Sequence, residues 1–132
     1  MNRCTRLRAP GVVLNDEGKP LFQQIAELIE NSIVDGSLAE ESQVPSTNEL
    51  AAFHRINPAT AAKGLNALVA DGILYKKRGI GMFVTTGARD KLIARRRDRF
   101  AQQYVVPLVL EAEKLGIGID ELKSMLDTRE HV

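Results

Sequence analysis

One stretch, residues 57–72, constrains the fold more than any other part of the chain. Asn57 is of a type favoured at a helix N-cap, and Pro58 suits the first helical position because its missing N–H needs no partner there. Gly72 is of a type common just beyond a helix end. These signals predict a single helix between Asn57 and Gly72.

The two sides of this predicted helix differ in composition. At 3.6 residues a turn, the residues separate into an apolar side and a side that is small and smooth. The apolar side holds Ala61, Leu65, Leu68 and Val69, and the smooth side holds Ala59, Thr60, Lys63, Asn66, Ala67 and Ala70. A side that faces water normally carries several charges, whereas this one carries a single cation. Such a smooth side is typical of a helix that lies in a DNA groove.

Two more helices are predicted before this one. Pro20 begins a helix that Gly36 ends. Its apolar stripe consists of Leu21, Phe22, Ile25, Leu28, Ile29 and Ile33. Ser46 and Glu49 have the spacing of a capping box, which begins a second helix, and we expect its buried side to consist of Leu50, Ala51 and Phe53. Because only a tight turn separates this helix from the helix that Asn57 begins, the pair is predicted to be a helix-turn-helix.

A β-hairpin is predicted after residue 72. Residues 73–77 and 82–85 are rich in strand-forming side chains and flank the segment 78–81, Arg-Gly-Ile-Gly. The two glycines allow a sharp turn and a close approach to another backbone. A nucleotide-phosphate loop is not expected, because this Gly-x-Gly follows no Rossmann-type strand and precedes no helix.

The segment from residue 88 onward is predicted to be helical again. Its broad apolar face consists of Leu92, Ile93, Phe100, Tyr104, Val105, Leu108, Val109, Ala112 and Leu115. Pro107 either kinks this helix or separates two helices, and we favour one kinked helix. The glycines at 116 and 118 end it, and Asp120 is expected to cap a last helix that carries Leu122, Met125 and Leu126. Since two helices cannot bury this much apolar surface alone, a second copy of the chain is expected to cover it.

The net charge of +1 hides blocks of opposite sign. Residues 20–44 carry five acidic residues and no lysine or arginine, whereas residues 85–100 carry six basic residues against two acidic ones. A basic block of this kind is a candidate phosphate-facing surface. For the run Arg95–Arg97 we favour another interpretation, a solvated helix side with ion pairs to the acidic first helix or to a partner subunit.

Several classes of protein and site are not expected. Cys4 is the only cysteine, which excludes an internal disulfide and a cysteine-based zinc cage, and His54 and His131 stand far apart, so neither a metal nor a cofactor is expected. No nucleophile, base and orienting group are assembled, so an enzyme is not expected. No run of about eighteen apolar residues indicates a membrane span, and the basic start lacks the apolar region of a secretory signal, so a cytoplasmic location is expected.

Three motifs carry a resemblance to a known family. They are Pro-Leu-Phe-Gln-Gln-Ile-Ala at 20–26, Val-Pro-Ser with Glu-Leu-Ala within 44–51, and Lys-Arg-Gly-Ile-Gly-Met-Phe-Val at 77–84. Together they resemble the winged helix-turn-helix domain of GntR-family transcription regulators over roughly residues 12–85. The turn at 57–60 and the short C-terminal pair of helices resemble the YtrA subfamily, whose members are small homodimeric repressors. Larger relatives carry an effector-binding domain after the wing, and we expect none within these 132 residues.

The resemblance implies a mainly α fold with a small β-hairpin. We expect an N-terminal arm at 1–19, with a short strand at 12–14 at most, a winged helix-turn-helix DNA-binding domain at 20–86 and a helical dimerisation region at 87–132. Carried over residue by residue, the DNA contacts of the family fall on Ser46, Asn57, Thr60, Lys63, Arg78 and Gly79. The dimer contacts are expected at Phe100, Tyr104, Leu108 and Leu122. Gly64 stands where relatives have alanine, and we expect it to allow close helix packing at a cost of roughly 1 kcal/mol in helix propensity.

Two functions follow as hypotheses. The first is a homodimeric, sequence-specific repressor that binds a two-fold operator in double-stranded DNA; a small-molecule effector, if one exists, would fit between the last two helices and their dimer mates. The alternative is a winged-helix protein-interaction module that docks a protein on the smooth side. Salt separates the two, because DNA binding through several Lys and Arg side chains weakens steeply as salt rises.

Overall fold

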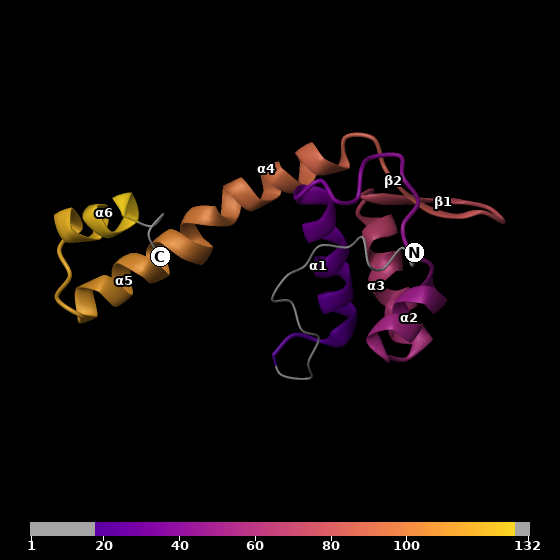
Figure 1. The fold of residues 1–132 in the computed structure, drawn as a ribbon, viewed down its shortest axis with the longest axis horizontal. Helices are drawn as coiled ribbons and strands as arrows, with labels where there is room; N and C mark the ends of the chain where they lie inside the picture. The colour runs from indigo at the N-terminus through magenta and orange to yellow at the C-terminus, as the bar shows by residue number, and fades with distance from the viewer. Residues whose placement is uncertain (1–17, 129–132) are drawn as a thin grey trace. The chain divides into compact units, whose positions relative to one another are not determined.

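The computed structural model of the chain describes residues 18–128. Most of the predicted arm, its strand at 12–14 and the residues Cys4 and His131 therefore lie outside the described residues. Figure 1 shows the order of the elements. They are α1 (Leu21–Val34), α2 (Thr47–His54), α3 (Pro58–Ala70), β1 (Leu74–Lys77), β2 (Gly81–Val84), α4 (Ala88–Phe100), the π-helical segment η2 (Ala101–Val105), α5 (Val106–Lys114) and α6 (Ile119–Asp127).

The chain forms two compact units, divided between Ile93 and Ala94 within α4. The first unit holds the three helices α1 to α3, the hairpin and the start of α4, and the second holds the rest of α4, η2, α5 and α6. The fold is therefore mainly helical with a two-stranded hairpin after the helix-turn-helix, as predicted. The predicted domain boundary at residue 87 stays a prediction. No helix of the described chain is long and apolar enough to span a membrane.

The core of the first unit forms where α1, α2 and α3 pack together and the hairpin covers them (Figure 1). Its fully buried side chains include Ile25, Ile29, Ile33, Leu50, Leu65, Leu68, Ile73, Leu74 and Val84. The first turns of α4 belong to this core, since Ala88 and Leu92 are buried in it. Arg89 fixes this start of α4 by donating from Nε to the Val34 carbonyl oxygen at 3.0 Å.

Gly64 confirms the expected close packing of α1 and α3. A Cβ atom added at this glycine would lie 2.7 Å from the carbonyl oxygen of Phe22 and 3.0 Å from Cγ2 of Ile25. A backbone oxygen on another helix cannot move away as a flexible side chain can. The absence of a side chain at Gly64 therefore sets the distance between α3 and the start of α1.

The buried side of α2 differs from the prediction at one position. Leu50 and Ala51 are buried, but Phe53 is 48% exposed and packs edge-on against the ring of His54 at 5.0 Å between centroids. At about 100° per residue, His54 falls in the arc between Leu50 and Ala51, whereas Phe53 falls beside it. His54 rather than Phe53 therefore continues the buried side, and burial lowers the pKa of its imidazole.

The hairpin is antiparallel, with Leu74 opposite Val84 and Lys77 opposite Gly81. A third segment, residues 41–44, pairs along β2 and was not predicted. The N–H of Val44 donates to the Met82 carbonyl oxygen at 2.9 Å, and the N–H of Val84 donates to the Ser42 carbonyl oxygen at 3.0 Å. The chain that enters α2 is thereby tied to the wing.

The second unit contains one uninterrupted helical backbone up to Lys114, so Pro107 does not separate two helices. The kink predicted at Pro107 stays a prediction. Pro107 stands in the first turn of α5, and the N–H of Val106 donates to the Ala101 carbonyl oxygen five residues earlier. This π-type bond places one extra residue in the helical turn just before Pro107. The nitrogen of the proline carries no N–H to donate.

The predicted cap of α6 is wrong by two residues. Gly118 is the N-cap residue, and Asp120 lies in the first turn of the helix, where its negative charge favours the helix dipole. The cause is the extended backbone of Gly118 at φ −75° and ψ 165°, which lets the helix begin directly at Ile119.

Candidate nucleic-acid interface

The exposed side of α3 is the one predicted to be smooth. Ala61, Gly64, Leu65 and Leu68 are the buried residues of this helix. Ala59, Lys63, Asn66 and Ala70 are exposed, and Thr60 and Ala67 are half-buried. The surface that α3 presents to solvent therefore consists of small side chains, two amide or hydroxyl groups and one ammonium group.

Asn57 begins α3 as predicted. Its Oδ1 accepts a hydrogen bond from the N–H of Ala59 at 2.8 Å, and Pro58 occupies the first turn. Because the cap uses only the oxygen of the amide, the Nδ2 group keeps its two hydrogens for an acceptor outside the chain. One side chain can thus begin α3 and still offer an N–H donor to a group outside the chain.

Lys63 has a partner that the sequence did not reveal. Its Nζ lies 4.1 Å from the centroid of the Phe22 ring on α1, a cation–π contact. An open concavity of about 380 Å³ surrounds the pair and is lined by Leu21, Phe22, Ala59, Thr60 and Lys63. The close approach at Gly64 brings Phe22 beside the smooth side of α3, so an aromatic ring of α1 becomes part of this surface.

Ser46 forms the predicted capping box at the start of α2. Its Oγ accepts from the N–H of Glu49 at 3.0 Å, and Glu49 Oε1 accepts from the N–H of Ser46 at 3.0 Å. The hydroxyl hydrogen of Ser46 remains available as a donor, and the first-turn N–H groups of Thr47 and Asn48 have no acceptor within the helix. This exposed helix start can hydrogen-bond an anion.

The wing carries cations on a stiff hairpin. Arg78 and Gly79 are exposed in its turn, where Gly79 has a φ of +77°, a backbone conformation that favours glycine. Lys77 lies with its Nζ 4.3 Å from the centroid of the Phe83 ring, which stacks on Tyr75 at 5.9 Å. The two aromatic rings hold the strands together beneath a basic edge.

The base of the wing is fixed by Glu41. Its carboxylate accepts hydrogen bonds from the hydroxyl groups of Thr86 and Tyr75. These bonds lower the pKa of the Glu41 carboxyl, and the bond from Thr86 contributes most. The hydrogen bond between Tyr75 and Glu41 also raises the pKa of Tyr75. The network joins the segment before α2 to Tyr75 on β1 and to Thr86, two residues beyond β2.

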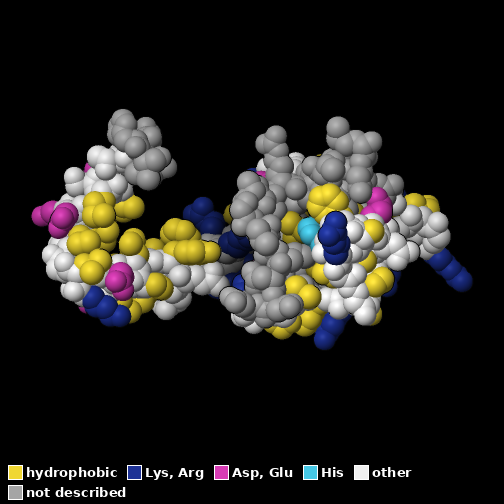
Figure 2. Space-filling view, turned by 60° about the horizontal axis from the view of Figure 1, so that its bottom comes forward, with side chains coloured by type: hydrophobic (Ala, Val, Ile, Leu, Met, Phe, Trp, Pro, Cys, Tyr) yellow, Lys and Arg dark blue, Asp and Glu magenta, His cyan; other side chains and the backbone are white. Residues whose placement is uncertain are grey.

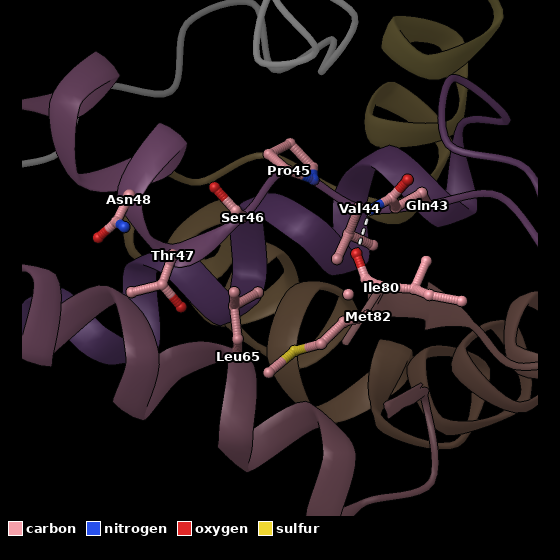
Figure 3. A pocket seen from close by; sticks show the side chains of 10 residues that line it. Gln43, Val44, Pro45, Ser46, Thr47, Asn48, Leu65, Ile80 and Met82 are labelled. Atoms are coloured by element: carbon pink, nitrogen blue, oxygen red, sulfur yellow. Dashed lines mark hydrogen bonds between the residues drawn. The ribbon is translucent and has the colours of Figure 1, made fainter. Parts of the chain in front are cut away.

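A small pocket separates the start of α2 from the wing (Figure 3). It has a volume of about 280 Å³, with Val44, Leu65 and Met82 among its apolar residues and Ser46 and Asn48 among its polar ones. Gln43 closes one side by donating from Nε2 to the Ile80 carbonyl oxygen at 3.0 Å. The structure thus brings Ser46 and the wing to opposite sides of one pocket.

Arg55 is a further cation of this surface that the predicted contact residues do not include. It is exposed in the turn between α2 and α3 and has a left-handed backbone with a φ of 56°. This conformation usually selects glycine or asparagine, so a long cation here is unusual. Nothing in the sequence indicated the left-handed backbone of Arg55, because this conformation depends on how α2 and α3 are placed.

The residues predicted for dimerisation lie in the second unit. Phe100 is 56% exposed and Tyr104 63% exposed, with their rings 5.7 Å apart, and Leu108 is exposed as well. Leu122 is only 8% exposed in the single chain. Figure 2 shows hydrophobic side chains gathered over α5 and α6. Between residues 105 and 126, the exposed large hydrophobic residues are Val105, Val106, Leu108, Leu110, Leu115, Ile119, Met125 and Leu126.

The chemistry of this site is that of binding. Residues 18–128 contain no group of three or more His, Cys, Asp or Glu side chains that could hold a metal ion. The six predicted contact residues all belong to the first unit, on α2, α3 and the wing. They offer amide, hydroxyl, ammonium and guanidinium donors, which suit phosphate oxygens and base-edge acceptors.

Comparisons with known proteins agree with this geometry. The model of the family described as bacterial regulatory proteins, gntR family, matches residues 21–84, from α1 to the end of β2. The HTH-type transcriptional repressor YtrA of Bacillus subtilis is 25% identical over 103 residues, which cover 78% of each protein.

Two solved structures are similar as well. A GntR-family transcriptional regulator from Bacteroides thetaiotaomicron has a TM-score of 0.67 at 30% identity, covering 85% of this chain and 97% of the other. The DNA-binding domain of AraR in complex with operator ORX1 has a TM-score of 0.50 at 29% identity, covering 59% of this chain and 90% of the other.

Proposed function

Because this chain belongs to the GntR family of bacterial regulatory proteins, we propose that it represses transcription as a homodimer bound to a two-fold operator. As a member of this family, the chain is a DNA-binding transcription regulator and not an enzyme. The observation that carries the proposal is the exposed side of α3, which is nearly free of charge although it faces solvent. The same first unit presents the cationic wing.

In the proposed complex, α3 lies in the major groove. Asn57 and Thr60 stand at the start of the helix, where the residues of a recognition helix contact base edges. Lys63, drawn toward Phe22 at the edge of α3, contacts a phosphate rather than a base. With Ala59, Ala67 and Ala70 offering only methyl groups, direct reading of the sequence concentrates on few positions, and DNA shape supplies part of the specificity.

The start of α2 and the wing complete the proposed contacts. Ser46 and the neighbouring first-turn N–H groups bind a phosphate of the DNA backbone. Arg78 enters the adjacent minor groove, and Gly79 lets the backbone of the turn approach the DNA closely. Ser46 lines the pocket between α2 and the wing, and Arg78 and Gly79 directly precede Ile80, which lines the same pocket.

The second unit supplies the proposed dimer interface. Exposed aromatic and aliphatic side chains at Phe100, Tyr104 and Leu108 form its centre, and Leu122 on α6, which is buried in the single chain, belongs to it as well. A two-fold dimer presents two recognition helices to two half-sites, which requires a palindromic operator. Repression is proposed because the relative YtrA is a transcriptional repressor. A small-molecule effector, if one exists, has its space between the last two helices and their dimer mates, and the complex forms in the cytoplasm.

Selection of bound DNA from a random pool, followed by gel-shift titration of the selected site, tests this function. We expect a palindromic site whose logarithmic affinity falls linearly with the logarithm of the salt concentration. Lys63→Ala should make that slope shallower by about one unit, whereas Lys123→Ala, which removes the same charge from an exposed position of α6, should leave it unchanged. Recovery of no preferred sequence, or an affinity independent of salt, would favour the protein-interaction module instead.

A further inference from the structure

One hydrogen bond holds the tip of the wing from outside the wing. Gln43 lies in the segment between α1 and α2, and its Nε2 donates to the Ile80 carbonyl oxygen at 3.0 Å across 37 residues of sequence (Figure 3). Neither the helix-turn-helix nor the hairpin contains this glutamine. Its side chain therefore joins the chain entering α2 to the turn of the wing.

Main-chain pairing alone does not reach the tip. The segment 41–44 pairs with β2 through its backbone at Val84 and at Met82, where the N–H of Val44 donates. Beyond Met82, the turn is held by its own bond from the N–H of Ile80 to the Lys77 carbonyl oxygen at 3.0 Å. The amide of Gln43 extends the pairing one step further along the wing.

Side-chain packing holds Met82 but not Ile80 at the tip. Met82 packs against the core, whereas Ile80 is exposed and borders a pocket of about 280 Å³ that Leu65 and the start of α2 also line. A Cβ atom added at Gly81 would lie 2.6 Å from Nε2 of Gln43, so the amide occupies the space that a side chain at 81 would fill. The hydrogen bond thus supplies an orientation that apolar contacts leave open.

The side chain presented by this arrangement is Ile80. It is 63% exposed, lies between two glycines and follows Arg78 by two residues. A branched apolar side chain in this position contributes little to the core, whose members exclude it. Apolar side chains on groove-binding elements contact the walls of the minor groove or wedge between base steps.

We propose that Gln43 is a positioning residue for DNA recognition, which fixes the wing tip so that Ile80 packs against the deoxyribose wall of the minor groove. The proposal rests on the proposed function, since it requires the wing to meet the operator. It adds a specificity determinant that carries no charge. Its contribution therefore appears in affinity and footprint but not in the salt dependence.

The test uses the full chain and the operator selected from a random pool. Gln43→Met keeps the length of the side chain without its donor, Ile80→Ala removes the apolar contact, and Ile80→Val is the conservative control. At fixed salt we expect Gln43→Met and Ile80→Ala each to weaken binding about three- to tenfold, and Ile80→Val to bind as the wild type does. The salt slope should stay that of the wild type.

Two further readouts separate positioning from a general structural role. The double variant Gln43→Met/Ile80→Ala should bind the operator no more weakly than whichever of the two single variants has the lower affinity. The reason is that the loss of Gln43 already removes the benefit of Ile80. Hydroxyl-radical footprints of Gln43→Met should lose protection of the minor-groove deoxyriboses beside each half-site. Protection of guanine N7 in the major groove from methylation by dimethyl sulfate should remain that of the wild type.

Wild-type affinity and footprint for Gln43→Met would overturn the proposal, as would losses that multiply in the double variant. Either result leaves the proposed function intact if Arg78→Ala still weakens binding. A wild-type chain that selects no DNA would overturn both together.

Discussion

The two units of this chain both contain amphipathic helices but differ in how far the apolar faces of these helices are buried. In the first unit, the apolar stripe of α1 is buried against α3, and the large side chains Ile25, Ile29 and Ile33 are almost fully covered. In the second unit, Ala112 and Leu122 are the buried hydrophobic residues among those described, and most other large apolar side chains are exposed. The first unit covers its own core, and the second does not.

This difference shows that helical periodicity predicts an apolar face but not which surface packs against it. Along α5, apolar residues stand on nearly every side, as Val106, Leu108, Val109 and Leu110 illustrate. A helix that is apolar all round is normally buried, and a surface of this kind normally marks an interface. We therefore expect the first unit to depend on its own packing and the second on a partner copy.

Removal of a core side chain should have the largest effect. Ile29→Ala deletes buried methyl and methylene groups on α1, and we expect it to lower the free energy of unfolding by about 2–5 kcal/mol at every protein concentration. The matched change Leu110→Ala, at an exposed position of α5, should lower stability in a way that depends on protein concentration. Denaturant titrations at two concentrations measure both, and equal behaviour of the two variants would contradict the comparison.

A charge in the second unit should break the dimer without unfolding the first unit. Phe100→Asp places a carboxylate within the proposed interface, and we expect the dissociation constant of the dimer to rise about thirtyfold or more. Sedimentation velocity across a concentration series measures this. Ser124→Asp, which adds the same charge at an exposed position of α6, serves as the control. An undisturbed Phe100→Asp dimer would place the interface elsewhere.

Loss of a wing cation should weaken DNA binding and leave the dimer intact. Arg78→Ala removes the guanidinium proposed to enter the minor groove, and we expect operator affinity to fall about fivefold to tenfold in a gel-shift titration at fixed salt. Arg97→Ala removes the same group from α4 and should bind the operator as the wild type does. Equal effects of the two variants would contradict the assignment of DNA contact to the wing.

Local signals explain how much of the fold was predictable. The N-cap at Asn57, the capping box at Ser46 and Glu49 and the glycine at 72 each act within a few residues, so the sequence locates them without knowledge of the rest. The hairpin was predictable for the same reason. Gly64 was recognised because a glycine inside a helix needs a packing reason, and the Phe22 carbonyl oxygen provides it.

The misses depend on contacts between distant segments. Pairing of 41–44 with β2 carries no periodic signal, because it consists of a single bridge between Gln43 and Phe83 with hydrogen bonds on either side of it. The ring of Phe22 beside Lys63 follows only from the distance between α1 and α3. The exposure of Phe53 follows from which arc of the short helix α2 meets the core. These three features can be recognised only when the packed structure is known.

The Phe22 ring gives a smaller and more specific prediction about the DNA-facing surface. Phe22→Leu keeps an apolar side chain on α1 but removes the cation–π contact with Lys63, which is worth about 0.5–1 kcal/mol at an exposed site. We expect operator affinity to fall about two- to fivefold, with wild-type affinity retained in Phe22→Tyr. The double variant with Lys63→Ala should show no further loss relative to Lys63→Ala alone; an additional loss would mean that Phe22 acts independently of the lysine.

The smallest expected effect concerns the base of the wing at acid pH. Hydrogen bonds from Thr86 and Tyr75 lower the pKa of Glu41 from its ordinary value of 4.5, so the folded state favours the charged carboxylate. The resulting stabilisation is complete above the ordinary pKa and is lost as the pH falls through the lowered one. Glu41→Gln should therefore be less stable than the wild type near neutral pH, and the difference should shrink as the pH falls below about 4.5. Urea midpoints measured across this range test the prediction, and a difference that stays constant with pH would show that the carboxylate charge at Glu41 does not hold the wing in place.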